Sequence, residues 1–228
     1  MKYGESTFHI LYLVFTVVMG LLILSKRKDT IGKLMGSATL LLGFGDAFHL
    51  IPRVVNYFAD GDFSFWLGTG KMITSITMTV FYVFMYLIWI RAFKAQENKI
   101  FKTVFYIAVI LRIALCLLPQ NRWFTNDGSL LIGIIRNIPF VVVGALIVII
   151  WFLRRKEIKV LSPVWLLVTL SFAFYIPVTL GASFIPVLGA LMLPKTLCYM
   201  LLLVFFWRYA KKDKRGNDKT LKKKFSNI

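Results

Sequence analysis

The chain has 228 residues, of which 58% are hydrophobic and only 17% are charged, and its formal net charge is +18. This number of charged residues is too small to cover the surface of a water-soluble domain. The composition therefore excludes a soluble fold and indicates a membrane protein. The positive charge lies in short loops between apolar segments rather than on one face, and this distribution does not indicate a nucleic-acid partner.

Seven apolar segments follow one another along the chain. They cover residues 8–25, 34–53, 65–90, 101–119, 130–153, 160–181 and 186–209. Each is close to the ~20 residues that an α-helix needs to cross a hydrocarbon core ~30 Å thick, and backbone in lipid must satisfy its own hydrogen bonds. We therefore predict an all-α, polytopic membrane protein, with seven transmembrane helices in one bundle over residues 1–209. Residues 210–228 are expected to form a basic, disordered cytoplasmic tail.

Lysine and arginine gather in every second loop. The loops at 26–33, 91–102 and 154–159 carry most of them, together with the segment after Trp207. The intervening loops at 54–64, 120–129 and 182–185 contain three aspartates and few cations. Because positively charged loops stay on the cytoplasmic side, we expect the N-terminus outside and the C-terminus in the cytoplasm. The expected location is the plasma (cytoplasmic) membrane of a bacterium.

Sequence motifs of soluble enzymes are absent. The chain contains no Walker loop, no dinucleotide-binding glycine motif after a strand, no HExxH and no GxSxG. Its two histidines are too few for a histidine-rich metal site, and its two cysteines fall in different predicted helices. We therefore predict no metal, no disulfide and no cofactor.

Ionisable and amide side chains nevertheless occur inside the apolar segments, where a charge is costly and by default marks a functional site. Asp46, His49 and Arg53 have the spacing i, i+3 and i+7, which places them on one stripe of the second segment. With the predicted orientation, all such groups lie in the outer half of the membrane or near its midplane. The other members are Lys71, Arg112, Asn121, Arg136, Asn137, Lys195 and Tyr199.

Positive charge predominates among these groups, because five basic side chains accompany the single carboxylate of Asp46. Turned toward the bundle interior, they would form an outward-facing cationic pocket, and buried charge is costly unless an anion or water offsets it. We therefore predict that the pocket binds an anionic amphiphile or lipid headgroup. Membrane lipids and anionic small molecules are the expected partners. If the ligand is also hydrolysed, Asp46 with His49 would supply the acid–base catalysis.

Each basic group also has a structural interpretation. Three of them could extend to the outer headgroups: Arg53, Lys71 and Arg136. Arg112 and Lys195 lie too deep for that, so for them the alternative is a buried ion pair with Asp46. Both interpretations stay open at this point.

The segment from Lys33 to Pro52 reads KLMGSATLLLGFGDAFHLIP. It resembles the lysoplasmalogenase-like (YhhN-type) family of membrane proteins, in which a serine, then Gly-Asp, then an apolar run ends a span. The resemblance implies a membrane-embedded lipid hydrolase whose first functional aspartate falls on Asp46. The second acidic motif of that family, a Ser-Asp pair late in the chain, has no counterpart here, since Ser171 is followed by Phe172.

Two other classes remain open. In a transporter or carrier of a small anionic or lipid-linked substrate, Arg112 and Lys195 would be the deep binding charges. In a seven-helix receptor or sensor, Lys195 would stand where microbial rhodopsins bind retinal. Leu191 occupies the position where those proteins have an acidic residue, so we do not expect retinal. The oligomeric state is left open.

Overall fold

The structure is a computed structural model that describes residues 2–182 and 184–225, with side chains up to residue 212. Seven α-helices lie within these residues: α1 (Lys2–Lys26), α2 (Thr30–Phe58), α3 (Ser64–Phe93), α4 (Lys99–Leu117), α5 (Leu130–Leu153), α6 (Val164–Gly181) and α7 (Met192–Phe225). Two 3-10 helices, Pro119–Asn121 and Pro186–Leu191, follow α4 and precede α7. No strand occurs in the described residues, so the predicted all-α class is confirmed.

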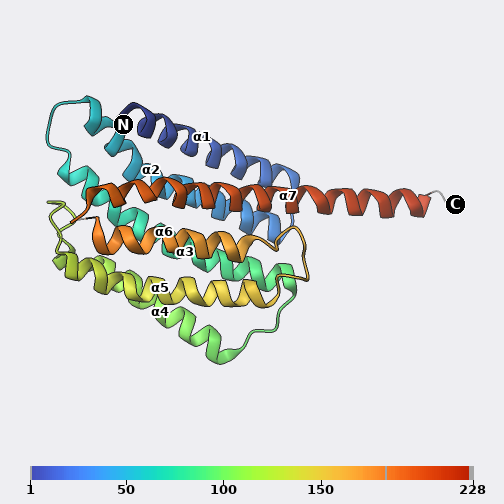
Figure 1. Ribbon diagram of the computed structural model, residues 1–228. Helices are drawn as coiled ribbons and strands as arrows, with labels where there is room; N and C mark the ends of the chain where they lie inside the picture. The colour runs from blue at the N-terminus through green and yellow to red at the C-terminus, as the bar shows by residue number, and fades with distance from the viewer. Residues whose placement is uncertain (1, 183, 226–228) are drawn as a thin grey trace.

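All seven helices are long and apolar enough to cross a membrane, as the sequence predicted, and this is the helix composition of a multi-pass membrane protein. Consecutive helices run in opposite directions, so the connections after α1, α3 and α5 gather at one end of the bundle (Figure 1). These connections hold the predicted basic loops, and α7 extends beyond the bundle on the same side. We call this side the basic end, and the opposite side the N-terminal end.

Several helix ends differ from the predicted segments, and proline explains three of them. α4 ends at Leu117 because Pro119 begins a 3-10 turn, and α6 begins only after Pro163. Residues 186–191 form a 3-10 helix that starts at Pro186. The segment expected to be a disordered tail is helical through Phe225, and it contains no proline to stop α7. Residues 226–228 lie outside the described residues.

The helices form a ring with one helix outside it. α1 packs against α2 and α7, α2 against α3, α3 against α5, α5 against α6, and α6 against α7. α4 packs against α3 and α5 and takes no part in closing the ring (Figure 1). The interior of the ring is therefore bordered by six helices, and α4 packs on the outside of the ring against α3 and α5.

Glycines allow α2 to approach its neighbours closely. A Cβ atom on Gly43 would collide with Thr16 of α1, and one on Gly45 would collide with Thr77 of α3. Small residues at such positions let transmembrane helices pack backbone against side chain. Asp46, which directly follows Gly45, is consequently held at the place where α1, α2 and α3 meet.

The basic end of the bundle has a dry aromatic core. Tyr86, Phe105, Trp151 and Phe206 are each 1% exposed or less and come from α3, α4, α5 and α7. The rings of Tyr86 and Phe105 lie 4.8 Å apart between centroids. Packing of this kind, rather than water exclusion, is what holds helices together in lipid.

Candidate functional site

The structure divides the predicted polar residues among three groups, each with its own contacts. The mouth group consists of Glu5, His9, Arg53 and Tyr57, at the start of α1 and the end of α2. The central group consists of Tyr12, Asp46, His49, Asn137, Tyr175, Lys195 and Tyr199, in the ring interior. The lateral group consists of Arg112, Asn121, Trp123 and Arg136, between α4 and α5.

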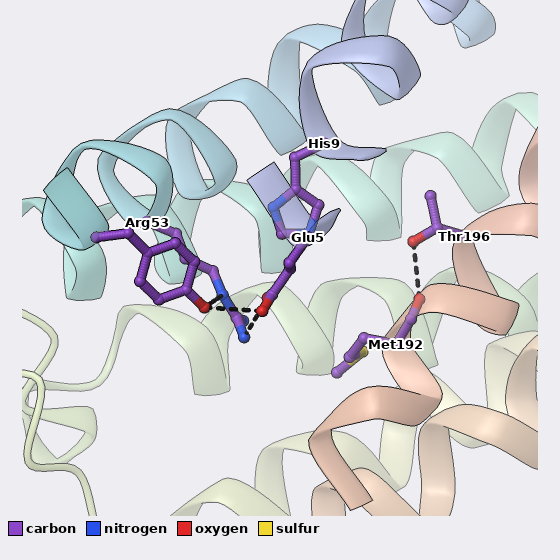
Figure 2. Close-up of polar contacts among 6 residues, drawn as sticks. Glu5, His9, Arg53, Met192 and Thr196 are labelled. Carbon is purple, nitrogen blue, oxygen red and sulfur yellow. Dashed lines mark hydrogen bonds and ion pairs between the residues drawn. The ribbon is translucent and has the colours of Figure 1, made fainter. Parts of the chain in front are cut away.

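The mouth group is a neutralised ion pair. Nη2 of Arg53 lies 2.7 Å from Oε1 of Glu5, and the Tyr57 hydroxyl donates a 2.9 Å hydrogen bond to Oε2 of the same carboxylate. Figure 2 shows the Glu5 carboxylate directed at the Arg53 guanidinium, with His9 one turn away on α1. Arg53 therefore forms an ion pair within the protein, whereas the sequence had left open that it extends to the outer headgroups. Sequence reasoning missed Glu5 because it precedes the apolar run, although α1 already begins at Lys2.

A buried tyrosine holds the carboxylate of the central group. The hydroxyl of Tyr12, whose side chain is 1% exposed, donates a 2.6 Å hydrogen bond to Oδ2 of Asp46. Within the described residues, no hydrogen bond joins Asp46 to His49, the partner expected from the sequence. The close packing of α1 against Gly43 brings Tyr12 within reach of the carboxylate. Nδ1 of His49 is buried and has no hydrogen-bond partner among the described side chains and backbone.

Lys195, on α7, lies near Asp46 and close to the rings of two tyrosines. Its Nζ is 4.9 Å from the ring centroid of Tyr175 and 5.8 Å from that of Tyr199. The charge of Lys195 attracts Asp46 across the site, but no carboxylate lies within ion-pair distance of its Nζ in the described part of the chain. The predicted alternative of a direct Lys195–Asp46 ion pair is therefore not formed.

Hydrogen bonds fix the aromatic wall around Lys195. The hydroxyls of Tyr82 and Tyr199 lie 2.9 Å apart, and Tyr175 donates a 2.7 Å bond to Oδ1 of Asn137. These bonds join α3 to α7 and α5 to α6. Sequence reasoning missed Tyr12, Tyr82 and Tyr175, because a tyrosine inside an apolar segment looks the same whether its hydroxyl has a partner or not.

The lateral group explains the position of Arg112. Its Nη1 donates a 2.5 Å hydrogen bond to the backbone oxygen of Arg136, and its guanidinium lies 5.2 Å from the ring centroid of Phe140. The predicted alternative of an Arg112–Asp46 ion pair is wrong, because α4 lies outside the ring that contains Asp46. Arg136 in turn donates a 2.7 Å bond to Oδ1 of Asn121.

Lys71 belongs to none of these groups. Its side chain is exposed, and Nζ donates a 2.7 Å hydrogen bond to Oδ1 of Asn126 in the connection between α4 and α5. This connection also borders a surface cleft of about 590 Å³ beside Trp123 and Arg122. The cleft is not lined by Asp46, Arg112 or Lys195, so the predicted residues do not share one large cavity there.

The side chains present do not suggest a metal centre. Across the described residues, no three His, Cys, Asp or Glu side chains approach closely enough to hold a metal ion. The chemistry available to the central group is therefore that of one carboxylate, one imidazole, one ammonium and several tyrosine hydroxyls.

Comparison with known proteins adds no assignment. No family model matches the chain, and neither the curated proteins nor the solved structures contain a match. The resemblance of residues 33–52 to the lysoplasmalogenase-like family accordingly stays a prediction, and the function is argued from the geometry of the site.

Proposed function

We propose that the central group binds the anionic headgroup of an amphiphile that enters from the extracellular side. The observation that carries this proposal is the position of Lys195, an ammonium in the ring interior with aromatic contacts but no ion-pair or hydrogen-bond partner among the described residues. The accumulation of lysine and arginine at the opposite end of the bundle supports an orientation with that end in the cytoplasm.

The energetics of an isolated ammonium favour an anionic ligand. Contact with an aromatic face stabilises a cation by ~0.5–2 kcal/mol, whereas removing an ion from water costs several kcal/mol. Two rings, Tyr175 and Tyr199, therefore offset only part of the cost of placing Lys195 inside the bundle. A phosphate or carboxylate on Nζ would offset the remainder, and the half-buried state of Lys195 leaves that atom within reach.

Asp46 supplies a hydrogen-bond acceptor to the site. Tyr12 occupies Oδ2, while Oδ1 has no hydrogen-bond partner in the described part of the chain. A headgroup that places its anion on Lys195 can therefore donate a hydroxyl to Oδ1. An apolar groove of about 330 Å³ lies on the outer face of α1 and α2, is lined in part by Gly43 and Ala47, and suits an acyl chain.

The test compares two lysolipids with the same acyl chain, lysophosphatidic acid and lysophosphatidylcholine, on the full-length protein in a non-ionic detergent. We expect the anionic lipid to raise the melting temperature by more than the zwitterionic one, since ligand binding to the folded state stabilises it. Lys195→Met should remove this difference. Lys33→Met, which makes the same charge change at an exposed position of the basic end, should keep it. Equal effects of both lipids on the unmodified protein would contradict the proposal.

A second candidate function is hydrolysis of the bound lipid, and the free Oδ1 of Asp46 favours it. A carboxylate fixed on one oxygen and free on the other can take a proton from an attacking water. Incubation with lysophosphatidic acid, followed by mass spectrometry of the products, tests this candidate. Asp46→Asn should abolish turnover and preserve the lipid-induced rise in melting temperature. Absence of turnover in the unmodified protein would leave only the binding function.

A further inference from the structure

Two arginines lie together between α4 and α5 without a carboxylate. Arg112 is 2% exposed, and it acts on Arg136 as a neighbouring like charge. Of the ion pairs formed among the described residues, none includes Arg112 or Arg136. Two guanidinium groups in a low-dielectric environment repel each other. The described residues supply no carboxylate to offset this repulsion.

Most donors of these arginines are unused. A guanidinium carries five N–H groups, whereas Arg112 has a single acceptor among the described residues, the backbone oxygen of Arg136, on Nη1. In the same part of the chain Arg136 also has a single acceptor, Oδ1 of Asn121, on Nη1. The Nε atoms of both arginines are buried and have no partner among the described residues. Buried donors without acceptors are rare, and here two belong to arginines that are joined through the backbone oxygen of Arg136.

The surroundings hold both side chains rigidly. Asn121 is 2% exposed and donates 2.8 Å hydrogen bonds from Nδ2 to the backbone oxygens of Leu115 and Leu118, so its Oδ1 is fixed toward Arg136. The Arg136 guanidinium stacks 4.1 Å from the ring centroid of Trp123. Trp123 is itself anchored by a 2.7 Å bond from Nε1 to the backbone oxygen of Cys116. The donors are therefore preorganised rather than mobile.

The lateral group is separate from the central group. Arg112 packs on the ring of Phe140, and Tyr175 meets the same ring edge-on with 5.8 Å between centroids. Phe140 thus contacts both groups, and it is 4% exposed. A ligand on Arg112 would be distinct from a ligand on Lys195.

We propose that Arg112 and Arg136 bind a phosphate-type oxyanion at the N-terminal end of the bundle, between the last turns of α4 and the first turns of α5. A tetrahedral oxyanion accepts hydrogen bonds from several directions at once, which suits two guanidinium forks and explains the unused Nε donors. Arg136 is half-buried, so the ligand can approach from its side. The oxyanion is either free phosphate or the phosphate of an outer-leaflet lipid, and the same donors serve both.

The test uses the full-length protein in phosphate-free buffer and non-ionic detergent, both unmodified and with Lys195→Met. The second background removes the proposed central site, so the two proposals fail independently. Melting temperatures are measured against inorganic phosphate, dihexanoyl phosphatidic acid and dihexanoylglycerol, which lacks the phosphate. We expect a concentration-dependent rise of about 3 °C or more at saturation with at least one phosphate ligand in both backgrounds, and none with dihexanoylglycerol.

Which ligand acts identifies the source. A rise with inorganic phosphate indicates a free-anion site, and a rise with phosphatidic acid alone indicates a lipid headgroup. Arg112→Gln and Arg136→Gln should each weaken the apparent affinity by about tenfold or more, as loss of a charge-assisted hydrogen bond does. If Arg112→Gln does not fold, Arg112→Lys keeps the charge without the fork and should still weaken binding.

Arg155→Gln is the matched control. Arg155 also donates to a backbone oxygen, that of Phe152, and also lies over an aromatic ring, but at the basic end of the bundle. This variant should keep the affinity of the unmodified protein. The proposal is overturned if neither phosphate ligand changes the melting temperature, or if Arg155→Gln weakens binding as much as Arg112→Gln does.

Discussion

The two ends of the bundle use their polar and aromatic residues in opposite ways. At the basic end, rings such as Phe105 and Trp151 are fully buried, and Arg27 pairs with Asp29 at 2.7 Å. At the N-terminal end, Lys195, Arg112 and Arg136 lie inside the protein without carboxylate partners in the described residues. Buried aromatic packing therefore marks the basic end, and basic side chains without carboxylate partners in the described residues lie toward the other. The contrast teaches that a charged residue in a helix indicates a ligand only where its counter-charge is absent.

The largest expected effect comes from the basic end. Phe105→Ala deletes a fully buried ring from the contact with Tyr86 and should lower the free energy of unfolding by ~3–5 kcal/mol. Denaturant titration in detergent micelles measures the loss. Because Phe105 lies far from both proposed sites, the affinity for lysophosphatidic acid should be unchanged at temperatures where the variant is folded. A loss below about 1 kcal/mol would contradict the view that the aromatic core dominates stability.

An intermediate effect is expected for the hydroxyl that holds Asp46. Tyr12→Phe leaves Oδ2 of a carboxylate without its donor and should cost about 2 kcal/mol of unfolding free energy. Tyr82→Phe removes a bond between two neutral hydroxyls and should cost about 1 kcal/mol. The same denaturant titration compares them. Equal losses would mean that the Asp46 bond is no stronger than a neutral one.

Breaking the ion pair of the mouth group should change binding more than stability. Glu5→Gln leaves Arg53 without its carboxylate, and the partly exposed pair contributes about 1 kcal/mol or less. The added positive potential at the mouth should speed association of lysophosphatidic acid at low salt. Glu157→Gln breaks the exposed Arg154 pair at the basic end and should leave the association rate unchanged. Stopped-flow fluorescence measures the association rates. Equal rates for the two variants would show that the mouth group has no influence on ligand entry.

The smallest effect is a pH dependence at the basic end. Hydrogen bonds from Arg27 hold the pKa of the Asp29 carboxyl below its ordinary value, and Asp29 also caps α2 through the backbone N–H of Gly32. A carboxyl with a lowered folded-state pKa contributes stability above its unfolded pKa of ~3.9, and this contribution is lost as the pH falls further. Because Asp29 is about half exposed, the contribution should be below ~1 kcal/mol. The melting temperature, measured from about pH 3 to about pH 6 and so across the ~3.9 reference pKa, should change less with pH in Asp29→Asn than in the unmodified protein.

Charge and hydropathy were sufficient to predict the seven helices, because each apolar segment is long enough to need no neighbour to define it. They also located Asp46, Arg112 and Lys195 as groups that require an explanation. The pairing of these groups was beyond the sequence. Tyr12 and Glu5 became visible as partners only through contacts between helices. The separation of Arg112 from Asp46 follows from the place of α4 outside the ring, and no periodicity in the sequence records that place.

Native mass spectrometry of the protein extracted gently from its membrane tests the central claim most directly. The account predicts that the unmodified protein retains an anionic amphiphile, and that Lys195→Met retains one equivalent less of it. Lys33→Met should retain the same amount as the unmodified protein. Identical bound lipid on the unmodified protein and on Lys195→Met would contradict the claim that the unpaired ammonium in the ring interior is a headgroup-binding site.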